Sequence, residues 1–300
     1  MRKAEEWNVF FEDKNRFADL INGIGCGGVQ IVKDTDLLEV DTVAGRKQRD
    51  ILRKVAFGVN FVIVGIENQE TDDYEMPFRT MCYDVSVYQK QISKMKKINR
   101  ANAKGLKPGE YMYGLKKEDR LKPVVTFVLY AGEGHWEGPH GLCDMMDFTD
   151  IPDELKAMVS NYKINVIPIR QLSNTDVFKT DVRHVFDFIR CSKDKKKLLE
   201  LVENDVYYKE MDDDAYAVVT KYTNSKELVK EKEYSIQGGK NDMCQAIKDL
   251  MSDSREEGRE EGMLLTLIDL VKDNLLSIEE AAKRMKMTVE DFQKELNANN

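Results

Sequence analysis

The sequence predicts an α/β fold with a helical C-terminal extension, and three observations support this. Residues 55–64 hold two apolar runs of strand length, and Gly58-Val59-Asn60 between them supplies turn chemistry, so the segment predicts a β-hairpin. Residues 78–95 place apolar side chains at helical spacing and lead to a second strand-length run at residues 124–130. From Asp176 onward the apolar spacing is mostly helical.

Two elements are expected before the hairpin. Residues 15–22 have the apolar spacing of a helix, which ends at Gly23. Asp19 lies within this helix, where it either faces the functional site or is exposed to solvent, and we favour exposure. Residues 27–41 are expected to form a short connection to the hairpin.

The hairpin brings polar residues together at its open end. With a turn centred between Gly58 and Val59, Asp50 lies opposite Glu67; a turn centred one position later places Asp50 opposite Gln69. Glu67 and Gln69 share one face because strand side chains alternate. Two carboxylates that meet at a strand end suit a hard cation such as Mg²⁺, although carboxylates in this position are often only solvated.

The elements after the hairpin complete the expected sheet. The helix at residues 78–95 is expected to pack across the sheet, with Arg79 and Tyr83 one turn apart on the same face. Arg79 either reaches a bound phosphate or pairs structurally with a carboxylate. Residues 124–130 are continuously apolar, which predicts a central strand covered on both faces. Residues 163–169 predict an edge strand because they contain a proline.

Three further helices are predicted, within residues 177–189, 198–202 and 215–222. The polar stretch 226–240 is a candidate linker. A longer helix begins at Met243 and continues through the repeat REEGREEG. Gly258 and Gly262 within this repeat each cost roughly 1 kcal/mol of helix stability relative to alanine, so the helix is expected to be weak unless it packs closely against another element.

Two short capped helices end the sequence. Ser277 and Glu280 have the spacing of a capping box, and Thr288 and Asp291 repeat it. The pair resembles a small helix-turn-helix, which would contact a DNA major groove. The second helix is mainly acidic and would be repelled by phosphates. We therefore favour self-association or packing on the body of the protein.

Cations are concentrated in one part of an otherwise acidic sequence. The net charge of −8 argues against a general polyanion-binding protein. Residues 90–122 nevertheless carry eleven cations against only three anions, Glu110, Glu118 and Asp119. The cations are Lys90, Lys94, Lys96, Lys97, Arg100, Lys104, Lys107, Lys116, Lys117, Arg120 and Lys122. The segment is either a basic face that contacts phosphates or a solvated loop.

Several short motifs in this sequence resemble those of one protein family. They are Arg49-Asp50, Gly65-Ile66-Glu67-Asn68-Gln69, Met76-Pro77-Phe78-Arg79 and Tyr83-Asp84, with Phe17-Ala18-Asp19 and the Arg-Glu-Glu-Gly repeats further away. The sequence closely resembles the Rpn family of recombination-promoting nucleases, also described as transposases, in the PD-(D/E)XK nuclease superfamily. In that superfamily an aspartate starts the second core strand and an E-x-K pair lies on the third. Here the pair is Glu67-x-Gln69, a replacement that this family commonly shows.

The resemblance implies a fold and a set of domains. The fold is the restriction-endonuclease-like αβββαβ core, a mixed central sheet flanked by helices. We expect the nuclease-like domain at residues 1–172 and a helical extension that packs on the core at residues 173–255. A helical tail with the helix-turn-helix-like segment is expected at residues 256–300.

The implied function is metal-dependent hydrolysis of DNA phosphodiester bonds by an endonuclease associated with recombination, transposition or defence against mobile elements. Asp50 and Glu67 would hold Mg²⁺, for which Mn²⁺ can substitute. Gln69 would orient the attacking water or the phosphate. Arg79, with Tyr83 beside it, would supply the positive charge that Gln69 lacks. The expected partners are DNA and a second copy of the chain in a homodimer.

Two alternatives remain open. In the first alternative, the fold is a nucleic-acid or protein interaction module whose site is weakened by Gln69. In the second, the tail from Ser252 onward makes the protein a DNA-binding regulator. Measured Mg²⁺ binding distinguishes the first alternative from the nuclease. Deletion of the tail tests the second.

The composition predicts a cytoplasmic protein that does not enter a membrane. The five cysteines contain no C-x-x-C pair, which fits reduced thiols. The N-terminal residues lack the apolar core of a signal peptide. No stretch approaches the roughly 18 apolar residues of a membrane span.

Overall fold

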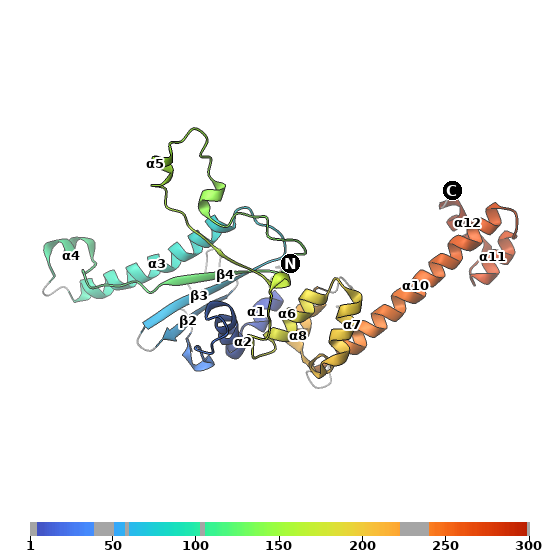
Figure 1. Ribbon diagram of the computed structural model, residues 1–300, viewed down its shortest axis with the longest axis horizontal. Coiled ribbons are helices and arrows are strands. Elements are labelled where there is room, and N and C mark those ends of the chain that lie inside the picture. Colours follow the sequence, from blue (N-terminus) through green and yellow to red (C-terminus); the bar gives the residue numbers. More distant parts are fainter. Residues whose placement is uncertain (1–4, 39–50, 58–59, 103–105, 223–239, 299–300) are drawn as a thin grey trace. The chain divides into compact units, whose positions relative to one another are not determined.

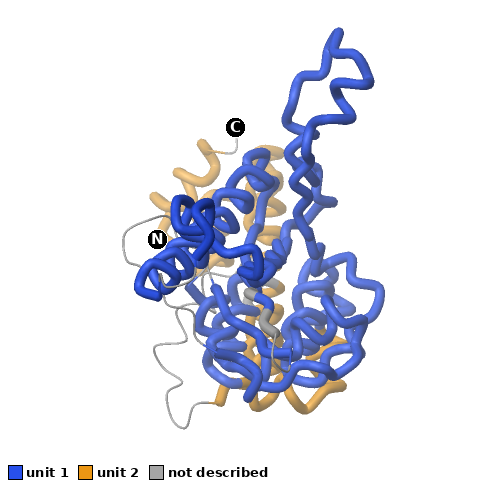
Figure 2. Tube along the Cα trace, turned by 90° about the vertical axis from the view of Figure 1, so that its left-hand side faces the viewer, with its two compact units in different colours: residues 1–198, 212–223 blue, residues 199–211, 224–300 orange. Residues whose placement is uncertain are grey.

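The computed structural model describes residues 5–38, 51–57, 60–102, 106–222 and 240–298. The chain divides into two compact units: unit 1 contains residues 1–198 and 212–223, and unit 2 contains residues 199–211 and 224–300 (Figure 2). Unit 1 contains a mixed five-stranded sheet with helices, which confirms the α/β prediction and is consistent with a PD-(D/E)XK-like core. Within the described ranges, no helix is long and apolar enough to cross a membrane.

The sheet has its strands in sequence order (Figure 1). These are β1 (Leu37–Leu38), β2 (Ile51–Phe57), β3 (Asn60–Gln69), β4 (Val124–Tyr130) and β5 (Asn165–Pro168). The first three strands pair antiparallel, whereas β3, β4 and β5 pair parallel. The predicted edge strand with its proline is therefore confirmed. The expected connection at residues 27–41 is more structured than predicted, since it contains the short strand β1.

The register of the hairpin decides between the two predicted turns. Ile51 pairs with Ile66 and Phe57 pairs with Asn60. This is the register of a turn centred between positions 58 and 59, so the alternative with Gln69 in the facing position is wrong. The open end of the hairpin is therefore the end where Ile66 and Glu67 lie.

Helix α3 (Met76–Ala101) covers one face of the sheet. Its first residue, Met76, packs with Val128 and Tyr130 of β4 in a buried cluster. The helix is longer than the predicted 78–95 and is followed by the short helix α4 (Pro108–Tyr113). The crossover from β3 through α3 to the parallel strand β4 matches the predicted order of elements.

The opposite face of the sheet is covered by the N-terminal helices. Helix α2 (Lys14–Leu20) continues into the π-helical turn η1 (Ile21–Gly25), where a β-carbon on Gly25 would lie 3.4 Å from the ring of Phe127. Helix α1 (Glu5–Phe10) precedes α2 and was not predicted. Its Trp7 donates a hydrogen bond to the Tyr222 hydroxyl at 2.9 Å. Both central strands, β3 and β4, are thus covered on two sides.

The expectation that Asp19 is exposed is wrong. Its side chain is buried, and its carboxylate accepts hydrogen bonds from the backbone N–H groups of Lys179 and Thr180 at 2.8 and 2.7 Å. The Thr180 hydroxyl donates a third bond at 2.7 Å. Asp19 therefore ties α2 to the segment before α6 and is not part of the site.

Among the described residues, the remaining helices are short, apart from α10. They are α5 (Asp153–Lys156), α6 (Val182–Cys191), α7 (Lys195–Asn204), α8 (Asp213–Thr220), α10 (Met243–Lys272), α11 (Ile278–Arg284) and α12 (Val289–Ala298), with 3₁₀ turns η2 (Asp34–Asp36), η3 (Leu142–Met145), η4 (Ile169–Gln171) and η5 (Val206–Lys209). A second, two-stranded sheet pairs β6 (Met211–Asp212) with β7 (Lys240–Asn241). Of the candidate linker, residues 226–239 lie outside the described part of the chain.

The C-terminal helices form their own core within unit 2. Ser277 and Thr288 accept hydrogen bonds from the backbone N–H groups of Glu280 and Asp291 at 3.3 and 3.1 Å, which confirms both predicted N-caps. Helices α11 and α12 pack with the C-terminal part of α10 around Ile268 and Phe292.

Candidate active site

Two acidic residues were predicted to lie at the open end of the hairpin, and the structure describes one of them. Asp50 lies outside the described residues. Ile51, the first described residue of β2, pairs with Ile66, which immediately precedes Glu67. The described register is therefore compatible with the predicted pairing of Asp50 and Glu67, and the role of Asp50 stays a prediction.

Glu67 is a buried carboxylate on the central strand β3. Its Cα partner on β4 is Val128, a member of the cluster that packs against Met76 of α3. Because strand side chains alternate, Glu67 lies on the sheet face covered by α3. Its side chain is 2 % exposed. A carboxylate at this depth is costly unless cations or hydrogen-bond donors compensate its charge.

Arg79 supplies positive charge beside Glu67. It lies in the first turn of α3, and its Nη2 atom is 3.6 Å from Oε2 of Glu67, an ion pair longer than a direct hydrogen bond. The guanidinium also donates to the carboxylate of Asp73 and to the hydroxyl of Tyr83. Burial lowers the pKa of Arg79, but the bonds to Tyr83 and Asp73 outweigh it and hold the pKa above its ordinary value.

The predicted residues Glu67, Arg79 and Tyr83 are thus brought together, and Asp73 joins them. Asp73 was not among the site residues predicted from the sequence. The signal that could have identified Asp73 is its position six residues before Arg79, at the entry to the same helix. Arg79 therefore pairs with carboxylates, which is one of its two predicted roles. Its contact with a phosphate stays a prediction.

Gln69 lies two positions beyond Glu67 and shares its face of β3. The Gln69 backbone carbonyl accepts a hydrogen bond from Ala131 at 2.9 Å, which anchors the end of β3 to the end of β4. The next residue, Glu70, forms an ion pair with Nζ of Lys221 at 2.7 Å. No motif indicated Lys221, because its partner is about 150 residues earlier in the chain and the pairing depends on the fold.

The donor atoms of this region fit a hard divalent cation. Glu67 offers carboxylate oxygens, and Gln69, two residues further along the same face of β3, offers an amide oxygen. Within the described ranges, no group of three or more histidine, cysteine, aspartate or glutamate side chains is placed to hold a metal ion. Asp50, the other predicted ligand, lies outside the ranges that were searched, so the ligand set stays a prediction.

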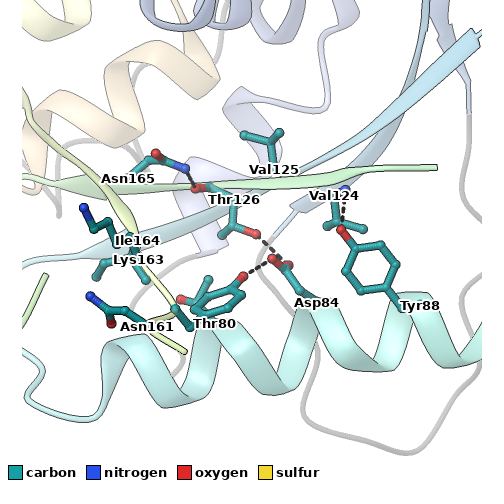
Figure 3. A pocket seen from close by; sticks show the side chains of 11 residues that line it. Thr80, Asp84, Tyr88, Val124, Val125, Thr126, Asn161, Lys163, Ile164 and Asn165 are labelled. Carbon is teal, nitrogen blue, oxygen red and sulfur yellow. Dashed lines mark hydrogen bonds between the residues drawn. The ribbon is translucent and has the colours of Figure 1, made fainter. Parts of the chain in front are cut away.

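A polar pocket lies between α3, β4 and the segment before β5 (Figure 3). Its floor holds Asp84, whose carboxylate accepts hydrogen bonds from the hydroxyls of Thr126, at 2.9 Å, and Tyr162. Asp84 is buried, and its two oxygens hold α3 to β4 and to the segment that precedes β5. The Tyr83-Asp84 motif therefore contains one residue that contacts Arg79 and one that positions the surrounding elements.

Comparison with known proteins identifies the family of the chain. A family model described as "Putative transposase, YhgA-like" matches residues 40–215. No curated protein and no solved structure gave a match. The matched range contains strands β2 to β5, helix α3 and every predicted site residue from Asp50 to Tyr83.

Proposed function

Since the chain belongs to the YhgA-like transposase family, the family of the Rpn recombination-promoting nucleases, we propose that it is a metal-dependent DNA endonuclease. The observation that carries the proposal is the buried carboxylate of Glu67 on β3, next to Arg79 at the start of α3. A carboxylate and a guanidinium side by side can support hydrolysis of a phosphodiester, since a carboxylate binds a divalent cation and a guanidinium binds a phosphate.

Asp50 and Glu67 are the residues that would hold Mg²⁺. The bound ion supplies Lewis-acid stabilisation of the phosphate and a more acidic water. Glu67 suits this role because its carboxylate is fixed on a central strand that is covered on both faces. A ligand on such a strand is held more firmly than a ligand on a loop.

Arg79 and Gln69 have the two supporting roles. Arg79 is oriented by Asp73 and Tyr83, so that its guanidinium stays beside Glu67. From there it can donate to a phosphate oxygen and stabilise the charge that develops on it. Gln69 is neutral and can orient the attacking water through its amide, while Arg79 provides the charge that a lysine provides in an E-x-K pair.

The test is cleavage of supercoiled plasmid by the purified full chain. We expect nicking with Mg²⁺ or Mn²⁺, none with a chelator, and none in Asp50→Ala or Glu67→Gln when circular dichroism shows an intact fold. The matched control is Glu137→Gln, which removes a carboxylate in the turn after β4 and is expected to nick like the unmodified chain.

Two results would contradict the proposal. If nicking persisted in Glu67→Gln, the reaction would not depend on this site. If the unmodified chain neither bound Mg²⁺ in calorimetry nor cleaved plasmid, oligonucleotide or single-stranded DNA, the interaction module would replace the nuclease as the function.

A further inference from the structure

A basic arm, formed by the described residues 90–102 and 106–122, belongs to unit 1. The Tyr88 hydroxyl accepts a hydrogen bond from the backbone N–H of Val124, and the Gln91 side chain bonds the backbone of Lys122. These bonds place the start of β4 beside the middle of α3. The rest of α3 therefore continues past the sheet and carries α4 at its far end (Figure 1).

The arm has a defined internal structure. Asn99 is buried, and its amide donates to the Gly114 carbonyl at 3.2 Å and to the Asp119 carboxylate at 2.7 Å. The same carboxylate accepts from the backbone N–H of Lys116 at 2.8 Å. Gly114 has a φ of 73°, a left-handed conformation that glycine adopts at little cost, and it ends α4. These bonds give the described part of the segment a defined fold.

The surface of the arm is strongly cationic. Ten of its described residues are lysine or arginine, against three carboxylates. Two of those carboxylates are engaged with the backbone: Glu110 accepts from Lys107 and Asp119 from Lys116, and these bonds hold the pKa of both groups below its usual range. Lys90, Lys94 and Lys97 are all exposed. Spaced four and three residues apart, they form one stripe along α3.

Exposed aromatic side chains accompany this charge. Tyr111 and Tyr113 on α4 are 66 % and 67 % exposed, and Met112 between them is 67 % exposed. Large apolar side chains at this exposure on three consecutive residues are unusual for a surface whose only task is to be solvated. Aromatic faces beside a cationic track are the arrangement with which proteins bind single-stranded nucleic acid.

We propose that the arm binds an unpaired strand of DNA, with the lysine stripe of α3 on its phosphates and Tyr111 and Tyr113 stacked on its bases. Bases in a duplex are stacked on each other, so the tyrosines reach base faces only where the strand is unpaired. Between Arg79 and Lys97, α3 spans roughly 27 Å, at 1.5 Å per residue. The arm would therefore hold the strand at a distance from Glu67, because Arg79 beside Glu67 and the lysine stripe lie at different points along the same helix, α3. The inference rests on the proposed function only in taking DNA as the ligand.

The test measures DNA binding without cleavage. Fluorescence anisotropy with a labelled oligothymidine and with a duplex of equal length, in the presence of chelator, compares the full chain with two variants. We expect Tyr111→Ala/Tyr113→Ala to weaken oligothymidine binding by roughly 5- to 150-fold for each base that loses its stacking partner. We expect Lys90→Ala/Lys94→Ala/Lys97→Ala to reduce the slope of log K against log salt concentration by roughly 0.7 for each phosphate that a lysine no longer neutralises.

Two control variants test whether the effects on DNA binding come from the aromatic rings and from the position of the lysines, and not from the tyrosine hydroxyls or from net charge alone. Tyr111→Phe/Tyr113→Phe keeps the aromatic faces and is expected to keep the affinity. Lys195→Ala/Lys196→Ala/Lys197→Ala removes three exposed lysines elsewhere in the chain and is expected to leave the salt slope unchanged. Thermal melting establishes that each variant is folded.

The outcomes distinguish this inference from the nuclease proposal. If the full chain binds neither DNA, or if the arm variants bind oligothymidine like the unmodified chain, the inference is overturned, whatever the plasmid assay shows. Equal losses for oligothymidine and duplex overturn the preference for unpaired DNA. If the arm variants lose oligothymidine binding while the unmodified chain nicks no plasmid, the arm stands and the nuclease proposal fails.

Discussion

At the scale of single residues, the central relation is the one between Glu67 and Arg79. Glu67 is almost fully buried, and Arg79 is the cation at 3.6 Å from it. The Arg79 guanidinium also donates hydrogen bonds to Asp73 and Tyr83, so its position does not depend on whether Glu67 binds another cation. A divalent cation at Glu67 would take over part of the compensation that Arg79 provides.

This relation makes a prediction for Arg79→Met, which keeps the length of the side chain and removes the charge. Without the guanidinium, the buried Glu67 carboxylate loses a partner, and we expect a loss of about 1–3 kcal/mol of unfolding free energy in chelator. Mg²⁺ should restore part of that loss, so the rise in melting temperature on adding Mg²⁺ should be larger in Arg79→Met than in the unmodified chain. Differential scanning fluorimetry with and without Mg²⁺ measures both.

Glu67→Gln is the matched control for this comparison. It removes the charge that both cations compensate, so Mg²⁺ should no longer raise the melting temperature in Glu67→Gln or in the double variant with Arg79→Met. An equal rise with Mg²⁺ in Arg79→Met and in the unmodified chain would show that the two cations do not share Glu67.

Asp19 shows at the residue scale what sequence reasoning misses. A helix with a single aspartate among apolar residues predicts an exposed carboxylate, because burial of a charge is costly. Here the cost is offset by two backbone N–H groups and a hydroxyl, all from residues 179–180. Those donors are about 160 positions away in sequence, and no local pattern indicates them.

At the scale of elements, the prediction from sequence succeeded where the residues that determine a helix or strand lie close to it in the sequence. The hairpin follows from apolar runs on either side of turn residues, and the N-caps at Ser277 and Thr288 follow from side chains that bond their own helix. Helix α1 was missed because it is short and because its Trp7 is buried against partners far along the chain, Phe186 and Tyr222. Arg16 in α2 is a similar case, since it is buried against Asp181 and Asp214.

The glycines of the REEGREEG repeat provide a prediction about α10. Gly258 and Gly262 lie within this helix, and a β-carbon at either position would meet open space, with no heavy atom within 4 Å. Neither glycine is therefore needed for a close approach within the described structure. We expect Gly258→Ala and Gly262→Ala to stabilise the helix by about 1 kcal/mol each, and to increase helical circular dichroism and protection of the repeat from proteases.

Gly114→Ala is the control with the opposite expectation. Its φ of 73° disfavours alanine, and the β-carbon would come within 3.1 Å of the Lys96 side chain. Destabilisation by the substitutions in α10 would indicate that the repeat packs against another surface in solution.

At the scale of the whole molecule, each unit has a core of its own. In unit 1, the central sheet is buried between α3 on one face and the N-terminal helices on the other. In unit 2, α11 and α12 bury Phe292 and Ile268 against α10. The family match covers residues 40–215 and ends before α10. The residues proposed for the nuclease chemistry, from Asp50 to Tyr83, all belong to unit 1. The domain boundaries after residues 172 and 255 stay predictions.

Separate cores predict separate responses to a core substitution. Phe292 is fully buried in unit 2, and Phe292→Ala would leave a cavity at a cost of about 3–5 kcal/mol. We expect scanning calorimetry to show one transition at a lower temperature and a second transition unchanged. Plasmid nicking and oligothymidine binding should be unaffected below the lower transition, because Glu67, Arg79 and the arm all belong to unit 1.

If the whole chain instead melted in one transition that shifted down with Phe292→Ala, the two units would fold as one cooperative structure. A loss of oligothymidine binding with unit 2 melted and unit 1 intact would favour the tail as the DNA-binding element.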